Sequence, residues 1–107
     1  MTEEDRIWKA LGDRTRRSIL DDLATEPRTT GALVERHPDL CRTAVMKHLA
    51  ILEAAGLVVV RREGRYRWNY LNPVPIERVC GRWIHGQVRH LSAAANRLRT
   101  LVDTQSS

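Results

Sequence analysis

The sequence predicts a mainly α-helical domain with one small antiparallel β-hairpin, an α+β class. Apolar residues recur at helical spacing along most of the chain, as on the buried face of a helix. Between Leu57 and Leu71 the pattern changes to a β-branched run, a turn at Gly64 and alternating aromatic residues. With 107 residues the chain has the length of one ordinary domain, so we expect residues 1–107 to form a single domain.

The first part of the chain predicts two helices, over 3–11 and about 14–24. Gly12 separates them, and Asp13 is a favourable N-cap for the second. We expect Arg16 and Arg17, which follow this cap, to face solvent or form salt bridges.

The segment from about 30 to 55 predicts a short helix, a turn and a longer helix. Thr29 or Thr30 caps the short helix, and Pro38 makes the turn. The longer helix begins near Arg42 and ends before Gly56, which suits the left-handed residue after a helix. This arrangement is a helix-turn-helix.

A ribbon over about 57–72 follows directly, and its turn is rich in arginine. Tyr66, Trp68 and Tyr70 alternate along the return strand, which places them on one face. Four arginines surround the turn: Arg61, Arg62, Arg65 and Arg67. A helix-turn-helix followed by such a ribbon is a winged helix-turn-helix, in which the ribbon is the wing. An arginine-tipped wing suits a narrow minor groove or the flanking phosphates, although a solvated hairpin is the alternative.

The last helix, over about 74–102, carries an apolar stripe at the spacing of a helix-pairing seam. So small a domain cannot cover a helix of this length, so we expect a dimer through the terminal helices. The alternative is that the helix folds back on its own domain. The predicted dimer interface consists of Ile7, Trp8, Leu11, Trp83, Ile84, Val88, Leu91 and Leu98.

Composition narrows the class of partner. The net charge of +5 and the pI near 10.0 favour a polyanion partner. The chain has no long apolar run and an acidic N-terminus, so we expect a cytoplasmic protein without a membrane partner. Its two cysteines, Cys41 and Cys80, do not form a disulfide framework.

The outward side of the longer helix supplies the candidate nucleic-acid contacts. The N-terminal part of the second helix in a helix-turn-helix meets base edges, and arginine or lysine pairs with guanine. Phosphate contact alone is an equal alternative for each residue. His48 is either a structural histidine or a phosphate contact, and Thr30 either holds a phosphate or simply helps cap its helix. The candidate double-stranded DNA contacts are Arg42, Thr43, Met46, Lys47, His48, Arg61, Arg62, Arg65, Arg67 and Thr30.

The sequence shows little sign of a catalytic site or a metal site. There is no glycine-rich phosphate loop and no nucleophile–base phrase, so we do not expect an enzyme. Cys41, Cys80, His37, His85 and His90 lack the spacing of metal-ligand pairs, so we expect no metal site and no cofactor.

Three phrases in the chain resemble the ArsR family of winged-helix regulators: Ala10 to Leu20, Met46 to Val58 and Arg61 to Leu71. The resemblance extends from about Ile7 to Trp83. It implies a homodimer with paired terminal helices that binds a palindromic operator as a transcriptional repressor.

The chain departs from the family pattern at two positions, with Met46 in place of a usual serine and Arg14 in place of a usual proline. It also lacks the cysteine pair of metal-sensing members, so it resembles the members without a known metal site. The alternatives are a winged-helix module used for protein interaction or dimerisation and, as a lesser one, a metal- or thiol-redox-sensing repressor. The sequence does not identify the operator, the regulated genes or a small-molecule effector.

Overall fold

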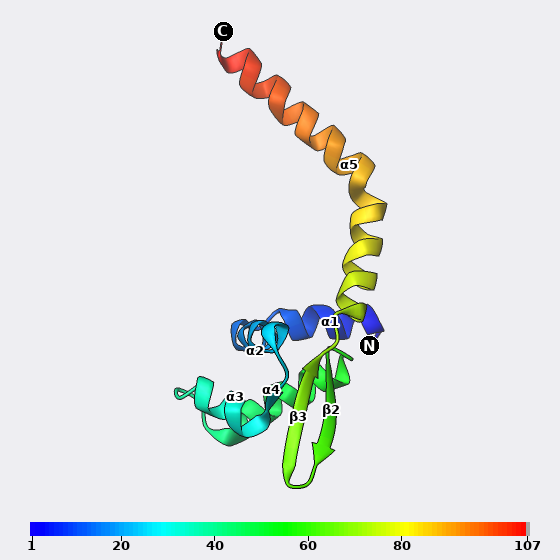
Figure 1. Ribbon diagram of the computed structural model, residues 1–107. Coiled ribbons are helices and arrows are strands. Elements are labelled where there is room, and N and C mark those ends of the chain that lie inside the picture. The colour runs from blue at the N-terminus through cyan, green and yellow to red at the C-terminus, as the bar shows by residue number, and fades with distance from the viewer. Residues whose placement is uncertain (107) are drawn as a thin grey trace. The chain divides into compact units, whose positions relative to one another are not determined.

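The computed structural model describes residues 1–106, apart from the side chains at positions 86, 88, 89, 105 and 106. It contains five helices and three strands within these residues (Figure 1). In chain order they are α1 (Glu3–Leu11), α2 (Arg14–Thr25), β1 (Arg28–Thr29), α3 (Thr30–Arg36), α4 (Arg42–Ala54), β2 (Val58–Glu63), β3 (Tyr66–Leu71) and α5 (Val74–Ser106). The predicted winged helix-turn-helix is therefore confirmed. The residues group into two compact units, Met1–Ile76 and the remainder of α5 from Glu77.

The wing belongs to a three-stranded antiparallel sheet with the order β1-β3-β2. Its hairpin turns at Gly64, whose φ of 61° lies in the left-handed region that favours glycine. The strand β1 was not predicted. Its Arg28 pairs with Asn69 and its Thr29 with Trp68, so it connects the start of α3 to the wing.

One face of α4 lies in the core. Val45, Leu49 and Leu52 are completely buried, as their i, i+4, i+7 spacing predicts. The chain leaves α4 through Gly56, at a φ of 76°. The core around α4 consists of Ala10, Ile19, Leu20, Leu23, Leu33, Val45, Leu49, Leu52, Ala55, Leu57 and Val58. Because α1, α2, α3 and β2 all contribute to this cluster, burial fixes which face of α4 points outward.

Arginine side chains join α1 to α2. Arg16 Nε donates to the Ala10 carbonyl oxygen at 2.9 Å, and Arg16 Nη2 donates to that of Lys9 at 2.9 Å. Arg17 Nη1 donates to the Leu11 carbonyl oxygen at 2.6 Å. The expectation of solvent-facing or salt-bridging arginines is incomplete, because both arginines also donate to backbone carbonyl groups at the end of α1.

Asn69 on β3 connects the wing to the helix-turn-helix. It is completely buried, and its Nδ2 donates to Thr30 Oγ1 at 3.1 Å and to the Arg28 carbonyl oxygen at 3.2 Å. Its Oδ1 has no hydrogen-bond partner among the described residues. The start of α3 is thus tied to the wing through one side-chain amide.

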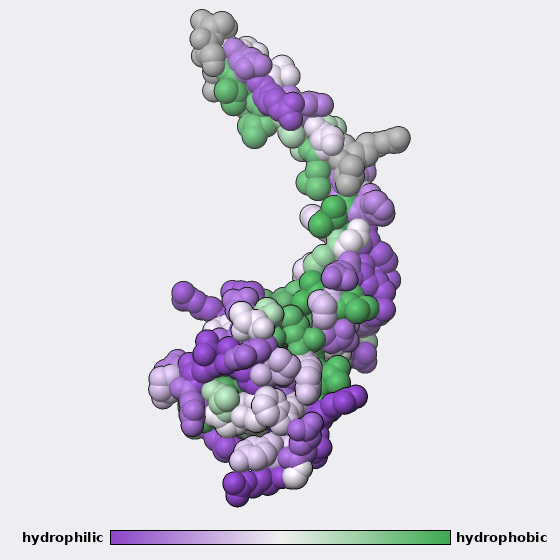
Figure 2. Space-filling view, in the orientation of Figure 1, coloured by the Kyte–Doolittle hydropathy of each residue, from purple (hydrophilic) through white to green (hydrophobic). Residues whose placement is uncertain are grey.

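The unit from Glu77 onward is a single stretch of helix. Large apolar side chains remain half exposed along it, and Figure 2 shows them as green patches on α5. No helix in the described part of the chain is both long and apolar enough to cross a membrane.

Replacing Asp13, the N-cap of α2, tests the cap and its charge. Its side chain accepts from the Arg16 N–H at 3.0 Å, and this bond lowers the pKa of Asp13 below its ordinary value. We expect Asp13→Ala to reduce the free energy of unfolding by about 1 kcal/mol near neutral pH. A carboxylate with a lowered folded-state pKa stabilises the fold above its unfolded pKa, and this stabilisation disappears as pH falls through the folded value.

Urea unfolding of both proteins at about pH 7 and about pH 2.5 measures this effect. The difference in free energy of unfolding between wild type and Asp13→Ala should shrink in acid. Asp13→Asn keeps a capping oxygen but cannot ionise, so it should lose less stability than wild type when the pH is lowered. Equal differences at both pH values would show that the charge of Asp13 contributes nothing.

Asn69→Ala is expected to destabilise the protein by about 1–3 kcal/mol, because the Thr30 hydroxyl and the Arg28 carbonyl would lose a donor in the interior. Hydrogen exchange should also accelerate in β1. Asn72→Ala is a comparison at a less buried amide, whose Nδ2 donates to the Gly56 carbonyl oxygen at 3.0 Å and whose Oδ1 accepts from the Val74 N–H at 3.3 Å. A loss below about 0.5 kcal/mol for Asn69→Ala, with unchanged exchange in β1, would contradict the role given to Asn69.

Candidate nucleic-acid interface

The outward side of α4 lies opposite its buried face. With about 3.6 residues per turn, Thr43, Lys47 and Ala50 fall on this side, and all three are exposed. All residues of Arg42–Ala54 are described, and Lys47 is the charged side chain on this outward line. The outward side of α4 therefore carries two small, partly apolar side chains and one charged side chain.

The edge of α4 that faces the wing carries Arg42, Met46 and Glu53. Arg42 is exposed, and Met46 is half-buried. Glu53 Oε2 accepts from Arg67 Nη2 of β3 at 2.9 Å, so an ion pair links this edge to the wing. Arg67 thus has a partner within the chain, a possibility that the sequence analysis did not include.

The opposite edge of α4 faces α1 and α2 through His48. His48 Nδ1 lies 3.3 Å from Arg16 Nη1 and 4.0 Å from Asp13 Oδ1. Of the two roles left open for His48, this geometry supports the structural one. The Arg16 backbone N–H is the main cause of the lowered pKa of Asp13, and the charges of Arg16 and His48 add to it. No local sequence pattern indicates that His48 lies beside Arg16 and Asp13, because both residues are at least 32 positions away from it in the sequence.

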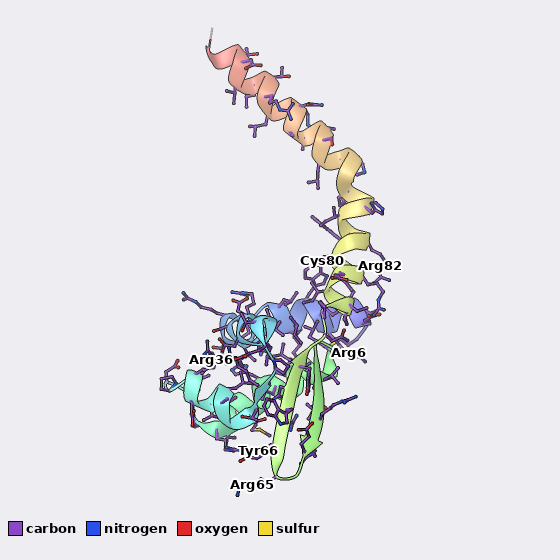
Figure 3. All side chains as sticks on the ribbon, viewed as in Figure 1. Arg6, Arg36, Arg65, Tyr66, Cys80 and Arg82 are labelled. Atoms are coloured by element: carbon purple, nitrogen blue, oxygen red, sulfur yellow. The ribbon has the colours of Figure 1, made fainter. Side chains whose placement is uncertain are left out.

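The wing presents its arginines around the turn. Arg61, Arg62 and Arg65 are exposed, and the guanidinium of Arg65 lies 5.4 Å from the centre of the Tyr66 ring. Figure 3 shows Arg65 and Tyr66 at the tip of the hairpin, where Figure 2 is strongly hydrophilic. Tyr66 is 51% exposed and was not predicted as a site residue. Such a contact holds a flexible arginine beside a rigid ring.

A hollow of about 260 Å³ lies between the wing and the helix-turn-helix. Its lining consists of Thr29, Thr30, Gly31, Arg42, Arg65, Tyr66 and Arg67. Arg42 from α4 and Arg65 from the wing therefore border one basic depression, although they are distant in sequence. Thr30 is only 3% exposed, and its hydroxyl is bound by Asn69, so its side chain is a poor candidate for a ligand contact. Thr29 caps α3 by accepting from the Ala32 N–H at 3.1 Å.

The residues predicted at a dimer interface differ in exposure. On α1, Ile7 is buried, Leu11 is half-buried and Trp8 is 42% exposed. On α5, Trp83, Ile84, Leu91 and Leu98 are 50% to 61% exposed. The side chain of Val88 lies outside the described residues.

Potential metal ligands do not gather in the part of the chain that the structure describes. No group of three or more histidine, cysteine or acidic residues that could hold an ion occurs there. Cys41 is exposed at the N-cap of α4, and Cys80 is half-buried on α5.

Comparison with known proteins places this geometry in a family. A family model described as a helix-turn-helix domain matches residues 11–61. The HTH-type transcriptional regulator YuzN of Bacillus subtilis is 41% identical over 87 residues, which cover 76% of this chain and 95% of YuzN. The transcriptional repressor SdpR of the same organism is 32% identical over 73 residues, which cover 68% of this chain and 80% of SdpR.

Solved structures agree with these relatives. The crystal structure of an ArsR family transcriptional regulator, RHA00566, superposes with a TM-score of 0.76 at 28% identity and covers 84% of this chain and 91% of its own. The chain belongs to the ArsR family of helix-turn-helix transcriptional regulators, which are DNA-binding proteins and not enzymes.

Proposed function

We propose that this regulator is a repressor that binds a palindromic operator as a homodimer. The observation that carries the proposal is the basic hollow bordered by Arg42 of α4 and Arg65 of the wing. Two elements that contact DNA in winged-helix proteins thereby present cations at one surface. A phosphate backbone attracts such a surface regardless of base sequence.

Within this surface we assign different roles to α4 and the wing. Thr43 and Lys47 lie on the outward side of α4 and, with Arg42 and Met46 at its edge, are the candidates for base contacts in the major groove. Arg61, Arg62 and Arg65 are the candidates for phosphates or the minor groove. Thr30, His48 and Arg67 have partners within the chain, so we give them positioning roles.

The homodimer is supported by the apolar side chains that α5 leaves exposed. Ile84, Leu91 and Leu98 recur at seven-residue intervals, which is the spacing of a helix-pairing seam. A two-fold dimer presents two copies of α4, and such symmetry matches a palindromic site. On α1, Trp8 is 42% exposed and stays a candidate for a dimer contact.

Repression is supported by the relative SdpR, whose name describes a transcriptional repressor. The relatives YuzN and SdpR are bacterial transcriptional regulators, and bacterial DNA lies in the cytoplasm, so we place this protein there. The alternative of a protein-interaction module would suit an uncharged wing, whereas this wing exposes Arg61, Arg62 and Arg65.

Sedimentation tests the homodimer. At micromolar concentration the wild-type protein should sediment at about 25 kDa, twice its mass of 12.3 kDa. Leu91→Glu with Leu98→Glu should shift the mass toward the monomer, because two carboxylates would have to be buried in the seam.

The matched control is Ala93→Glu with Thr100→Glu. These exposed residues have the same spacing on the opposite side of α5, so the pair should remain dimeric. A wild-type monomer at concentrations where the protein occupies an operator would contradict the homodimer.

Binding across a salt series separates base contacts from backbone contacts. The operator is first selected from random duplexes, and each variant is then measured on this operator and on a scrambled duplex. Arg42→Ala and Lys47→Ala should weaken operator binding by about 1–3 kcal/mol and relax base preference. Arg65→Ala should weaken binding to both duplexes and reduce the salt slope by about one unit.

Arg97→Ala removes the same charge from the exposed surface of α5 and serves as the control for net charge. It should leave the preference for the operator unchanged. Equal losses on both duplexes for the α4 variants would mean that α4 contacts only the backbone. Wild-type binding by Arg61→Ala, Arg62→Ala and Arg65→Ala alike would remove the wing from the interface.

A further inference from the structure

The base-facing part of α4 combines the cations of Arg42 and Lys47 with small or flexible apolar groups. A recognition helix that contacts bases only through hydrogen bonds would present several amide, guanidinium or carboxylate groups to the major groove. Here Thr43 and Ala50 on the outward side offer a hydroxyl and two methyl groups, and Met46 at the wing edge offers a thioether. Within the fully described α4, Lys47 supplies the charge of this outward line.

Methyl groups of this kind have one natural partner in the major groove. Thymine alone of the four bases carries a C5-methyl group there, and side-chain methyl groups contact it apolarly. Methionine adapts its shape to such a contact, because its side chain is flexible and polarisable. Thr43 and Met46 lie in the first two turns of α4, the part of a recognition helix that meets base edges.

We propose that α4 recognises part of its operator half-site through thymine C5-methyl groups, which contact the methyl group of Thr43 and the thioether of Met46. This inference rests on the proposed binding of operator DNA. It adds that A·T pairs are specified at the positions beneath Thr43 and Met46. At these positions the hydroxyl group of Thr43 contributes less to base preference than the apolar contacts do. The competing explanation is that these residues are small or flexible only to let α4 approach the DNA closely.

Deoxyuridine scanning distinguishes the two explanations. Each thymidine of the selected operator is replaced in turn by deoxyuridine, which removes the C5-methyl group and keeps every hydrogen-bonding group. Loss of one buried methyl contact should weaken binding about fourfold at one or more positions in each half-site. Weakening of less than 1.5-fold, as a rough threshold, at every position would overturn the inference while leaving operator binding intact.

A double-mutant cycle assigns the contact to a residue. Thr43→Ser removes one methyl group and keeps the hydroxyl group, so it should weaken binding about fourfold on the thymidine duplex and have no further effect on the matching deoxyuridine duplex. Thr25→Ser removes the same methyl group from the exposed end of α2 and should change neither affinity. Equal losses for Thr43→Ser on both duplexes would show that the methyl groups do not meet, which also overturns the inference. If the wild-type protein selects no operator, the proposed function itself fails.

Discussion

The burial of one face of α4 is the constraint on which the rest of this molecule depends. Val45, Leu49 and Leu52 are completely buried, and full burial of each such side chain contributes about 1.5–3 kcal/mol. Their sum is comparable to the roughly 5–15 kcal/mol of net stability of a whole domain. Rotating α4 to present another face would expose these residues. The hydrophobic core therefore determines that Thr43, Lys47 and Ala50 point outward, and does so before any ligand binds.

Polar side chains hold the two edges of the same helix. Glu53 binds Arg67 of the wing on one edge, and His48 lies beside Arg16 and Asp13 on the other. Partly exposed pairs of this kind contribute little free energy, about 0–1 kcal/mol each. Their effect is geometric, because they align α4 with β3 and with the α1–α2 corner. Asn69 completes this arrangement by joining β3 to the start of α3.

The sequence predicts the elements of this fold better than the connections between them. The face of α4, the turn at Gly64 and the alternation of Tyr66, Trp68 and Tyr70 follow from local periodicity and turn chemistry, and the helix-turn-helix and wing were predicted from them. The strand β1 has two residues, too few to show any periodicity, and it exists through its pairing with β3. Likewise, Asn69 bonds Thr30 across 39 positions, and His48 meets Arg16 across 32. Partners so distant arise from tertiary packing, which a single sequence does not display.

Under the proposed function, affinity and specificity would reside on different elements. The guanidinium groups of Arg61, Arg62 and Arg65 on the wing would supply attraction to any phosphate backbone, and salt would screen that attraction. The outward line of α4 carries one charge, so it would add little to binding of random DNA and much to the choice among sequences. Residues on that line could then change the operator without changing non-specific affinity. Arg67, although it lies on the arginine-rich wing, would affect binding through its ion pair with Glu53, which sets the position of the wing beside α4.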